Sequence, residues 1–275
     1  MVKPELSIII TSYKNPELLR LCLNSIKKNV KEIDYELIVV DSATEEDTEL
    51  TIREDFLGIR FFPFEKNVGF QELVKKGINE SKGDYLLILN GDILVREKSI
   101  AELLKYLKED QLVGMVGPKL LNFNGGFQDS CFRFYKPITI VYRRTWLGRF
   151  AFAKKHLDKF LMKDYDHKNP KEVDWLMGSA MMMPRSAIKK VGLMDSNFFM
   201  YMEDVDWCRR FWENRLKVVY VPNSVMLHYH GKGSGKKGLF YSVFFNKLTW
   251  IHIASAMKYF KKYLGKTNPR KNLKR

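Results

Sequence analysis

The triplet Asn90-Gly91-Asp92 places a carboxylate in a turn directly after an apolar run, Tyr85–Leu89. A hard cation such as Mg²⁺ or Mn²⁺ that bridges a diphosphate needs only one or two protein carboxylates, because phosphate oxygens and water complete its coordination. A single aspartate such as Asp92 can therefore suffice to hold such a metal. The alternative is a turn aspartate that caps the next helix, and this motif by itself does not separate the two.

A second acidic group begins a predicted helix that runs to Asn214. Glu203, Asp204 and Asp206 supply three carboxylates in four positions. The helix macrodipole favours acids in a first turn, and Asp206 can pair with Arg210 one turn later, but these effects explain two of the three at most. Aromatic neighbours would desolvate the remaining carboxylate, which suits a general base. These neighbours are Phe198, Phe199, Tyr201 and Trp207.

Two histidines, His228 and His230, follow a strand-like run, Val218–Val221, and stand beside a segment of Gly, Lys and Ser that ends at Gly235. A single histidine in such a place is usually a surface residue. A pair beside a flexible basic loop is better suited to ligating a metal and contacting a diphosphate.

The elements that must position these groups alternate between β-branched runs and helical patterns, which indicates a parallel sheet with crossover helices. The predicted strands are Leu6–Ile10, Tyr35–Val40, Arg60–Pro63, Tyr85–Leu89 and Val113–Val116. The predicted helices are Pro16–Lys28, Thr44–Phe56, Phe70–Ser81 and Ser99–Lys108. We therefore predict an α/β, Rossmann-like fold with a mostly parallel central sheet and helices on both faces.

Polar or glycine-rich triplets follow four of these strands. They are Thr11-Ser12-Tyr13, Asp41-Ser42-Ala43, Asn67-Val68-Gly69 and Asn90-Gly91-Asp92. Ligands bind at the carboxyl ends of the strands in open sheets, so four such triplets in succession favour a ligand site over plain turns. Neither GxxxxGK[ST] nor GxGxxG occupies the first strand–helix turn, which removes the main support for a kinase, ATPase or dinucleotide-binding protein.

Taken in order, these pieces resemble the family 2 glycosyltransferases of the GT-A fold, and in particular their rhamnosyltransferase-like branch. The matching text is SIIITSY (7–13), ELIVVDSATEEDT (36–48), NVGF (67–70), GDYLLILNGD (83–92), WLMGSAMMMPRSAIKKVGLMD (175–195), FFMYMEDVDWCRR (198–210) and HYHGKGS (228–234). The resemblance covers residues 5–235, and the ordered set is far more specific than any single motif.

The resemblance implies a nucleotide-sugar site and a divalent metal, Mn²⁺ or Mg²⁺. The residues expected to bind the nucleotide sugar are Thr11, Tyr13, Asp41, Asn67, Gly69, Asn90, Gly91 and Asp92. Asp41 would reach the base or the ribose. Asp92 matches the last aspartate of the family's DxD motif and would bind the metal together with His228, with His230 as the other candidate ligand. The motif here reads Asn-Gly-Asp, with asparagine at a position where the branch commonly has it.

The same resemblance implies how transfer occurs. Asp204 matches the aspartate of the family's Glu-Asp doublet and would deprotonate the acceptor hydroxyl as it attacks the anomeric carbon from the face opposite the diphosphate. Glu203 would orient the acceptor or the base. The acceptor pocket would be shaped by Trp175, Met177 and Gly178.

The implied reaction is inverting, non-processive transfer of rhamnose or another hexose from a dTDP- or UDP-linked donor to a lipid-linked or surface-glycan acceptor. Processive synthases of the family tend to carry a Gln-x-x-Arg-Trp motif and several membrane spans, and neither is found in this sequence. Transfer to a polyprenyl phosphate is the nearest alternative, since that acceptor needs no deprotonation. A nucleotidyltransferase would open with a Gly-rich, basic loop, which Thr11–Asn15 is not. The retained acids and His228 disfavour an inactive sugar-binding protein.

Four segments are predicted along the chain. Residues 1–121 form a nucleotide-sugar-binding half, and residues 122–170 an irregular insertion or flap with a helix near Phe150–Met162. Residues 171–235 form an acceptor-binding and catalytic half, and residues 236–275 a basic, amphipathic C-terminal helical tail.

The net charge of +15 is concentrated near the C-terminus. No Asp or Glu follows Glu213, against fourteen Lys and Arg, whereas the first 213 residues carry 33 basic and 32 acidic side chains. Apolar and basic residues of Ile253–Leu264 fall on opposite helical faces, as in interfacial helices, and the preceding apolar run, Leu239–Ile251, is too short to span a bilayer. We predict that the tail binds an anionic membrane surface, with packing on the domain as the alternative, and we expect no nucleic-acid partner.

Cysteine usage indicates the compartment. Cys22, Cys131 and Cys208 are widely separated and form no CxxC pair, and the N-terminus lacks a signal-peptide pattern. A reducing, cytoplasmic environment follows as the expectation. Together with the basic tail, this predicts a peripheral protein on the cytoplasmic face of the membrane.

Overall fold

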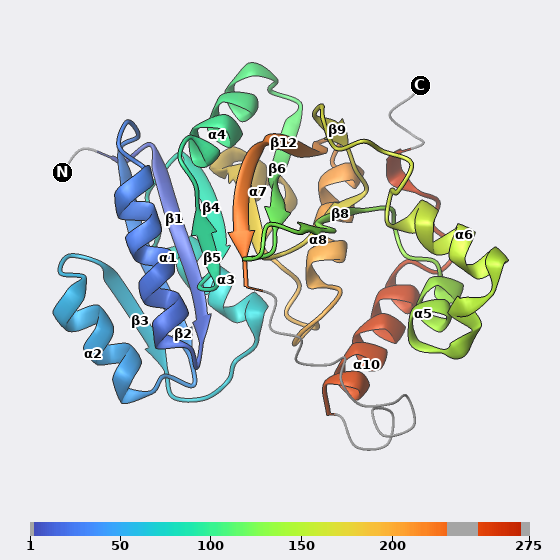
Figure 1. The fold of residues 1–275 in the computed structure, drawn as a ribbon, viewed down its shortest axis with the longest axis horizontal. Coiled ribbons are helices and arrows are strands. Elements are labelled where there is room, and N and C mark those ends of the chain that lie inside the picture. Colours follow the sequence, from blue (N-terminus) through green and yellow to red (C-terminus); the bar gives the residue numbers. More distant parts are fainter. Residues whose placement is uncertain (1–2, 230–246, 271–275) are drawn as a thin grey trace.

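The apolar runs of the first ninety residues form four parallel strands, β1 to β4, in the computed structural model, which describes residues 3–229 and 247–270. Strand β1 lies between β2 and β4, and β3 extends the sheet beyond β2 (Figure 1). The bounds are β1 Leu6–Tyr13, β2 Tyr35–Ser42, β3 Arg60–Phe64 and β4 Tyr85–Asn90, joined by the helices α1 Pro16–Asn29, α2 Glu46–Asp55 and α3 Phe70–Glu80. The predicted βαβ order is confirmed.

Side chains that alternate along β1 divide the interior into two cores. Ile9 packs in one core with α3, whereas Ile8 and Ile10 pack in the other with α1 and with α4, Ser99–Glu109. Successive side chains of a strand point to opposite faces, so a fully apolar strand is stable only where helices cover both faces of the sheet. This explains why the early strands are continuous apolar runs.

The second half of the chain completes the same sheet. The remaining strands are β5 Ile93–Val95, β6 Val113–Leu121, β7 Phe127–Gln128, β8 Cys131–Phe132, β9 Lys171–Glu172, β10 Trp175–Leu176, β11 Ala180–Pro184 and β12 Lys217–His228. The ten-stranded sheet has the order β3-β2-β1-β4-β11-β6-β12-β5, with β7 on β6 and β9 on β12, and β11 runs antiparallel to β4. Strands β8 and β10 are not part of it and pair with each other in a separate two-stranded sheet. Strand β12 is parallel to β6 and antiparallel to β5. The short strand β5 was not predicted, because three residues carry no readable period.

The segment 122–170 is more ordered than the sequence predicted. Besides β7 and β8 it contains α5 Pro137–Arg144, the 3₁₀ helix η1 Trp146–Arg149 and α6 Ala151–Phe160. The expected helix near Phe150–Met162 corresponds to α6, but α5 was missed. Its apolar residues do not form a buried stripe, since only Thr139 of this helix is buried, so the periodic signal of a core-facing helix is absent.

The C-terminal helix α10, Lys247–Lys262, packs on the domain. Ala256, Tyr259 and Tyr263 are buried in the core shared with α8, Glu203–Glu213, although Met257 and Leu264, from the face assigned to the membrane, are exposed. This is the packing alternative for the described part of the tail. The apolar run Leu239–Ile251 lies largely outside the described residues. Within those residues, no helix has the length and apolar character needed to cross a membrane.

Candidate active site

A cavity of about 470 Å³ opens at the carboxyl ends of β1 and β4. It brings together residues that are distant in sequence, because β4 and β11 pair so that the Asn90 N–H donates to the Ser179 carbonyl at 2.9 Å. The predicted site residues that line the cavity are Thr11, Tyr13, Asn67, Gly69, Asn90, Gly91, Asp92, Met177, Gly178, Glu203, Asp204 and His228. Among the predicted site residues that the structure describes, only Asp41 and Trp175 do not line it.

Asp41 lies fully buried at the end of β2, paired in register with Ser12. Neither carboxylate oxygen forms a well-aligned hydrogen bond with the described residues, although Thr44 and Ser12 lie close. Burial raises the pKa of Asp41, while Thr44 and Ser12 partly oppose this effect. A buried acceptor without a well-aligned donor is costly in a folded protein, so a donor brought to this carboxylate would stabilise it.

Gly69 forms the turn into α3 beside the cavity. Its φ is +85°, and a Cβ would lie 2.5 Å from the carbonyl oxygen of Phe199. The Asn67 side chain accepts a hydrogen bond from the Gly69 N–H at 3.1 Å and so holds the turn. A left-handed backbone in close contact with another chain segment accepts only glycine, which accounts for this residue in the NVGF text.

Asp92 and His228 meet through the pairing of β5 with β12, in which His228 lies opposite Ile93. The distance from His228 Nε2 to Asp92 Oδ1 is 3.4 Å. Two adjacent ligands of an octahedral cation at about 2.1 Å lie about 3 Å apart, so the pair fits a shared divalent metal. Apart from this contact, Oδ1 of Asp92 is buried without a hydrogen bond to the described chain. His230 lies outside the described residues.

The sequence analysis missed Gln128 of β7, which supports His228 from behind. Its Oε1 lies 3.0 Å from Nδ1 of His228, and both side chains are buried. When Nδ1 donates this hydrogen bond, Nε2 carries the lone pair that a metal requires, and the ring orientation is held. No sequence signal could reveal Gln128, because it belongs to the segment that has no readable period.

Glu203 and Asp204 begin α8 as adjacent carboxyl groups at the cavity wall. Asp204 accepts backbone hydrogen bonds from Gly178 at 3.1 Å and Val205 at 2.8 Å. Asp204 is half-buried, open to the cavity but enclosed by protein elsewhere, and burial raises its pKa to about 6, against the lowering effect of these hydrogen bonds. Burial and the neighbouring Asp204 raise the pKa of Glu203 well above its ordinary value. Both carboxyl groups of this pair therefore have raised pKa values, and that of Asp204 suits a group that accepts a proton near neutral pH.

The third acid of this group has a structural role. Asp206 is fully buried and pairs with Arg210 at 2.9 Å, as the sequence predicted. It also accepts from Tyr263 Oη at 2.7 Å and pairs with Lys262 at 2.6 Å, both from the tail. Asp206 therefore anchors the C-terminal segment on the helix that carries Asp204.

The tail also supports the loop before α8. Ser255 of α10 donates a hydrogen bond to the carbonyl of Met200 at 2.8 Å, and Met200 lines the cavity. The next two residues, Tyr201 and Met202, both have φ of +69°. Strained backbone of this kind persists only where the surroundings hold it, and α10 supplies part of that support.

The three residues predicted for the acceptor differ in position. Met177 and Gly178 line the cavity, and a Cβ on Gly178 would lie 3.1 Å from the Phe70 ring. Trp175 is buried instead, stacked on Phe132 at 4.2 Å between centroids, with its indole N–H donating to the Arg133 carbonyl. Trp175 therefore supports the wall from behind and does not face the cavity.

A mostly parallel sheet whose strand ends carry the Asp92–His228 pair and the adjacent carboxyl groups of Glu203 and Asp204 in one cavity is the arrangement of a GT-A glycosyltransferase. Residues 7–192 match glycosyl transferase family 2, and the chain belongs to this family of inverting glycosyltransferases.

Known proteins resemble the chain over most of its length. It is 25% identical to the rhamnosyltransferase WbbL of Escherichia coli K12, over 92% of this chain and 91% of that protein. It is also 25% identical to the N-acetylglucosaminyl-diphospho-decaprenol L-rhamnosyltransferase of Mycobacterium tuberculosis H37Rv, over 79% of this chain and 74% of that protein. The fold resembles the crystal structure of GalNAc-T7 with UDP, GalNAc and Mn²⁺, with a TM-score of 0.63 at 15% identity, over 99% of this chain and 54% of that chain.

Proposed function

We propose that this chain transfers one sugar at a time, rhamnose or another hexose, from a dTDP- or UDP-linked donor to a hydroxyl of a lipid-linked or surface-glycan acceptor. The observation that carries the proposal is the placement of Asp204 in the same cavity as Asp92 and His228. A base of raised pKa and a site for a metal-bound diphosphate are the two requirements of a single displacement at an anomeric carbon.

In the proposed reaction, Asp204 accepts the proton of the acceptor hydroxyl while the acceptor oxygen bonds to the anomeric carbon. The bond from that carbon to the donor phosphate oxygen breaks on the opposite face, and its electron pair leaves with the nucleoside diphosphate. One displacement inverts the configuration. The hydrogen bonds from Gly178 and Val205 hold the carboxylate in place during the proton transfer.

Asp92 and His228 would hold Mn²⁺ or Mg²⁺, with Gln128 orienting the imidazole. When bound, the metal neutralises charge on the leaving diphosphate. Asp41 would accept a hydrogen bond from the N3–H of uracil or thymine, a donor that cytosine lacks. This matches its two buried oxygens without aligned partners.

The acceptor class follows from the relatives. One similar protein acts, by its name, on a decaprenol-linked diphosphate sugar. A lipid-linked acceptor at the cytoplasmic face of the membrane is the corresponding proposal here, and the basic tail could contribute contacts to anionic lipid. If the acceptor were a polyprenyl phosphate, its oxygen would need no base, and Asp204→Asn would retain most of the activity.

Thermal shift tests the donor site, because a ligand that binds the native state raises the melting temperature by mass action. We expect UDP or dTDP, but not CDP, to raise the melting temperature in the presence of Mn²⁺. In Asp92→Ala the shift should no longer depend on Mn²⁺, and in Asp41→Asn it should no longer differ between the bases. Asp164 is exposed, and Asp164→Ala should behave as wild type. The absence of any shift with a folded sample would refute the donor site.

A further inference from the structure

Large apolar side chains are exposed on α5, η1 and α6. They are Ile138, Val141, Trp146, Phe150 and Phe152, and Trp146 and Phe152 are each 62% exposed. Soluble proteins expose single apolar residues everywhere, but a concentration within fifteen residues indicates a surface that meets a partner. We call these five residues the helical patch.

The aromatic members of the helical patch form one continuous surface. The ring centroids of Trp146 and Phe150 lie 5.4 Å apart, and those of Phe150 and Phe152 lie 5.6 Å apart. Tyr142 adds an edge contact to Phe152 at 5.9 Å. Because these rings already touch one another yet remain open to solvent, the patch is preformed.

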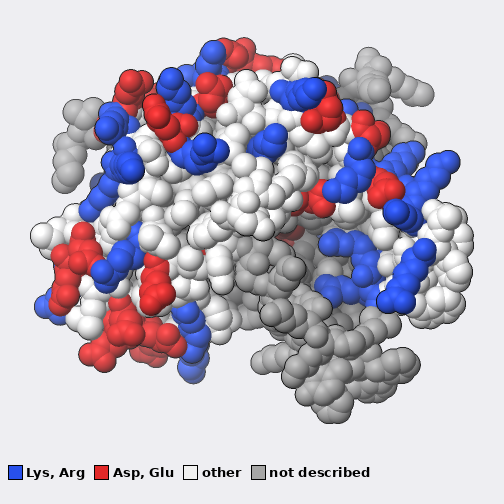
Figure 2. All heavy atoms as spheres, viewed as in Figure 1, with Lys and Arg blue, Asp and Glu red and all other residues white. Residues whose placement is uncertain are grey.

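Basic side chains surround the helical patch. Between residues 136 and 159 the only acid is Asp158, whereas the exposed basic residues are Lys136, Arg143, Arg149, Lys154, Lys155 and Lys159. None of these six forms an ion pair with the described residues, although elsewhere many Lys and Arg do. Figure 2 shows Lys and Arg gathered beside uncharged surface at the edge where Figure 1 places α5 and α6.

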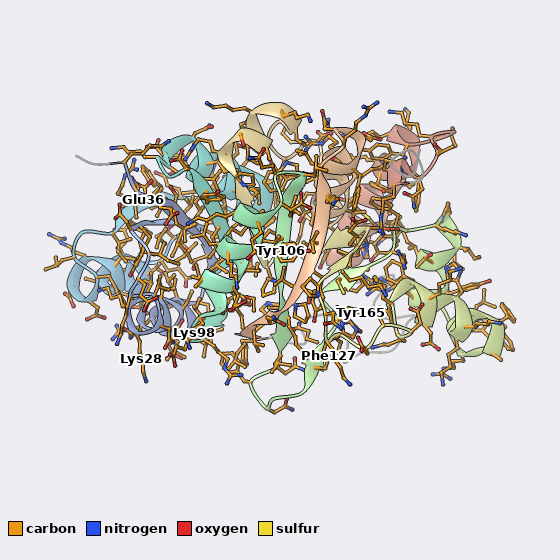
Figure 3. The ribbon with its side chains drawn as sticks, turned by 90° about the horizontal axis from the view of Figure 1, so that it is seen from above. Lys28, Glu36, Lys98, Tyr106, Phe127 and Tyr165 are labelled. Carbon is orange, nitrogen blue, oxygen red and sulfur yellow. The ribbon has the colours of Figure 1, made fainter. Side chains whose placement is uncertain are left out.

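Helix α5, which carries part of the helical patch, also borders a cavity beside the active site. Arg143 lines a second cavity of about 590 Å³, and Met177 lines both this cavity and the first. Phe127 also lines the second cavity, and Figure 3 shows it on the opposite side of the domain from Glu36. A molecule seated on the patch could therefore extend past Arg143 and Met177 toward Asp204.

We propose that the helical patch docks on an anionic lipid bilayer and holds the active site over a membrane-anchored acceptor. This role rests on the function proposed above. The aromatic and aliphatic side chains of the patch match the acyl region at the interface of such a bilayer. The surrounding cations match its anionic headgroups. A protein partner of mixed surface charge would leave these cations without counter-charges. The patch thus supplies a membrane contact that does not depend on the tail.

Tryptophan quenching by vesicles with brominated acyl chains tests the surface, because Trp175, Trp207 and Trp212 are buried and only Trp146 and Trp250 are exposed. With phosphatidylcholine–phosphatidylglycerol vesicles we expect quenching that Trp146→Phe removes and Trp250→Phe leaves. Loss of quenching in Trp250→Phe alone would move the contact to α10 and overturn the proposal.

Vesicle sedimentation tests the charge. Each near-surface cation contributes on the order of fivefold to the partition coefficient, so Arg149→Gln/Lys154→Gln/Lys155→Gln should bind about a hundredfold more weakly. The matched control carries three exposed lysines changed elsewhere, Lys31→Gln/Lys189→Gln/Lys190→Gln, and should bind as wild type.

Three outcomes of the sedimentation would overturn the proposal. The first is binding to pure phosphatidylcholine vesicles as tight as binding to the anionic vesicles. The second is a loss of binding in the matched control equal to that in the triple variant. The third is a wild-type protein that does not bind vesicles but self-associates, with the self-association abolished by Trp146→Ser/Phe152→Ser. The Mn²⁺-dependent thermal shift with UDP, measured on the same variants, separates a failed surface from a failed donor site. A shift without vesicle binding refutes the surface alone, and vesicle binding without a shift refutes the proposed function alone.

Discussion

Asp204 should make sugar transfer depend on pH in a range where an ordinary aspartate would not. Its ordinary pKa of 3.8 rises to about 6 through burial. About nine tenths of the carboxyl is then ionised at pH 7 and about one tenth at pH 5, so the turnover number should fall about tenfold between them. An aspartate of ordinary pKa would lose only about a twentieth of its ionised form over the same interval.

The assay is release of nucleoside diphosphate at saturating donor, acceptor and Mn²⁺, so that weaker metal binding at low pH does not contribute. Asp204→Asn should lower the rate by about a hundredfold or more and remove the acidic limb, because proton transfer by a positioned base contributes about that much. Glu203→Gln should keep the limb. A rate that changes by less than twofold between pH 5 and pH 7, or an Asp204→Asn enzyme of near wild-type activity, would refute the assignment of the base.

Three further variants test the surroundings of the site. Gln128→Leu should weaken Mn²⁺ binding about ten- to a hundredfold, measured by calorimetry with UDP present, because the orientation of His228 is lost; unchanged affinity would contradict this role. Glu203→Gln should raise the melting temperature at pH 8 but not at pH 4. The pKa of Glu203 in the folded protein lies above its ordinary value of 4.5, so folding of the wild type takes up a proton. The free energy of unfolding of the wild type therefore falls as the pH rises above 4.5, whereas glutamine removes this loss. Tyr263→Phe should lower the free energy of unfolding by about 2 kcal/mol, seen in urea titrations, because buried Asp206 loses a donor; a change below about 0.5 kcal/mol would show that Arg210 and Lys262 suffice.

The sequence was sufficient for the parts of the fold whose signals are local. Short apolar runs marked β1 to β4. The polar triplets that follow them all lie near one edge, because parallel strands joined by crossover helices must end on the same side. The i to i+4 pairing of Asp206 with Arg210 was predicted for the same reason, since one helical turn brings the two side chains together.

Other features were decided only by contacts between distant segments. Asp92 and His228 are 136 positions apart and meet because the three-residue β5 pairs with β12, while Gln128 comes from β7 on β6. The amphipathic pattern of Ile253–Leu264 was visible, but a pattern of apolar and basic residues does not say whether lipid or protein covers it. In the tertiary structure the buried Asp206 has Tyr263 and Lys262 as partners from outside its own helix, so for this part of the tail protein covers the apolar face.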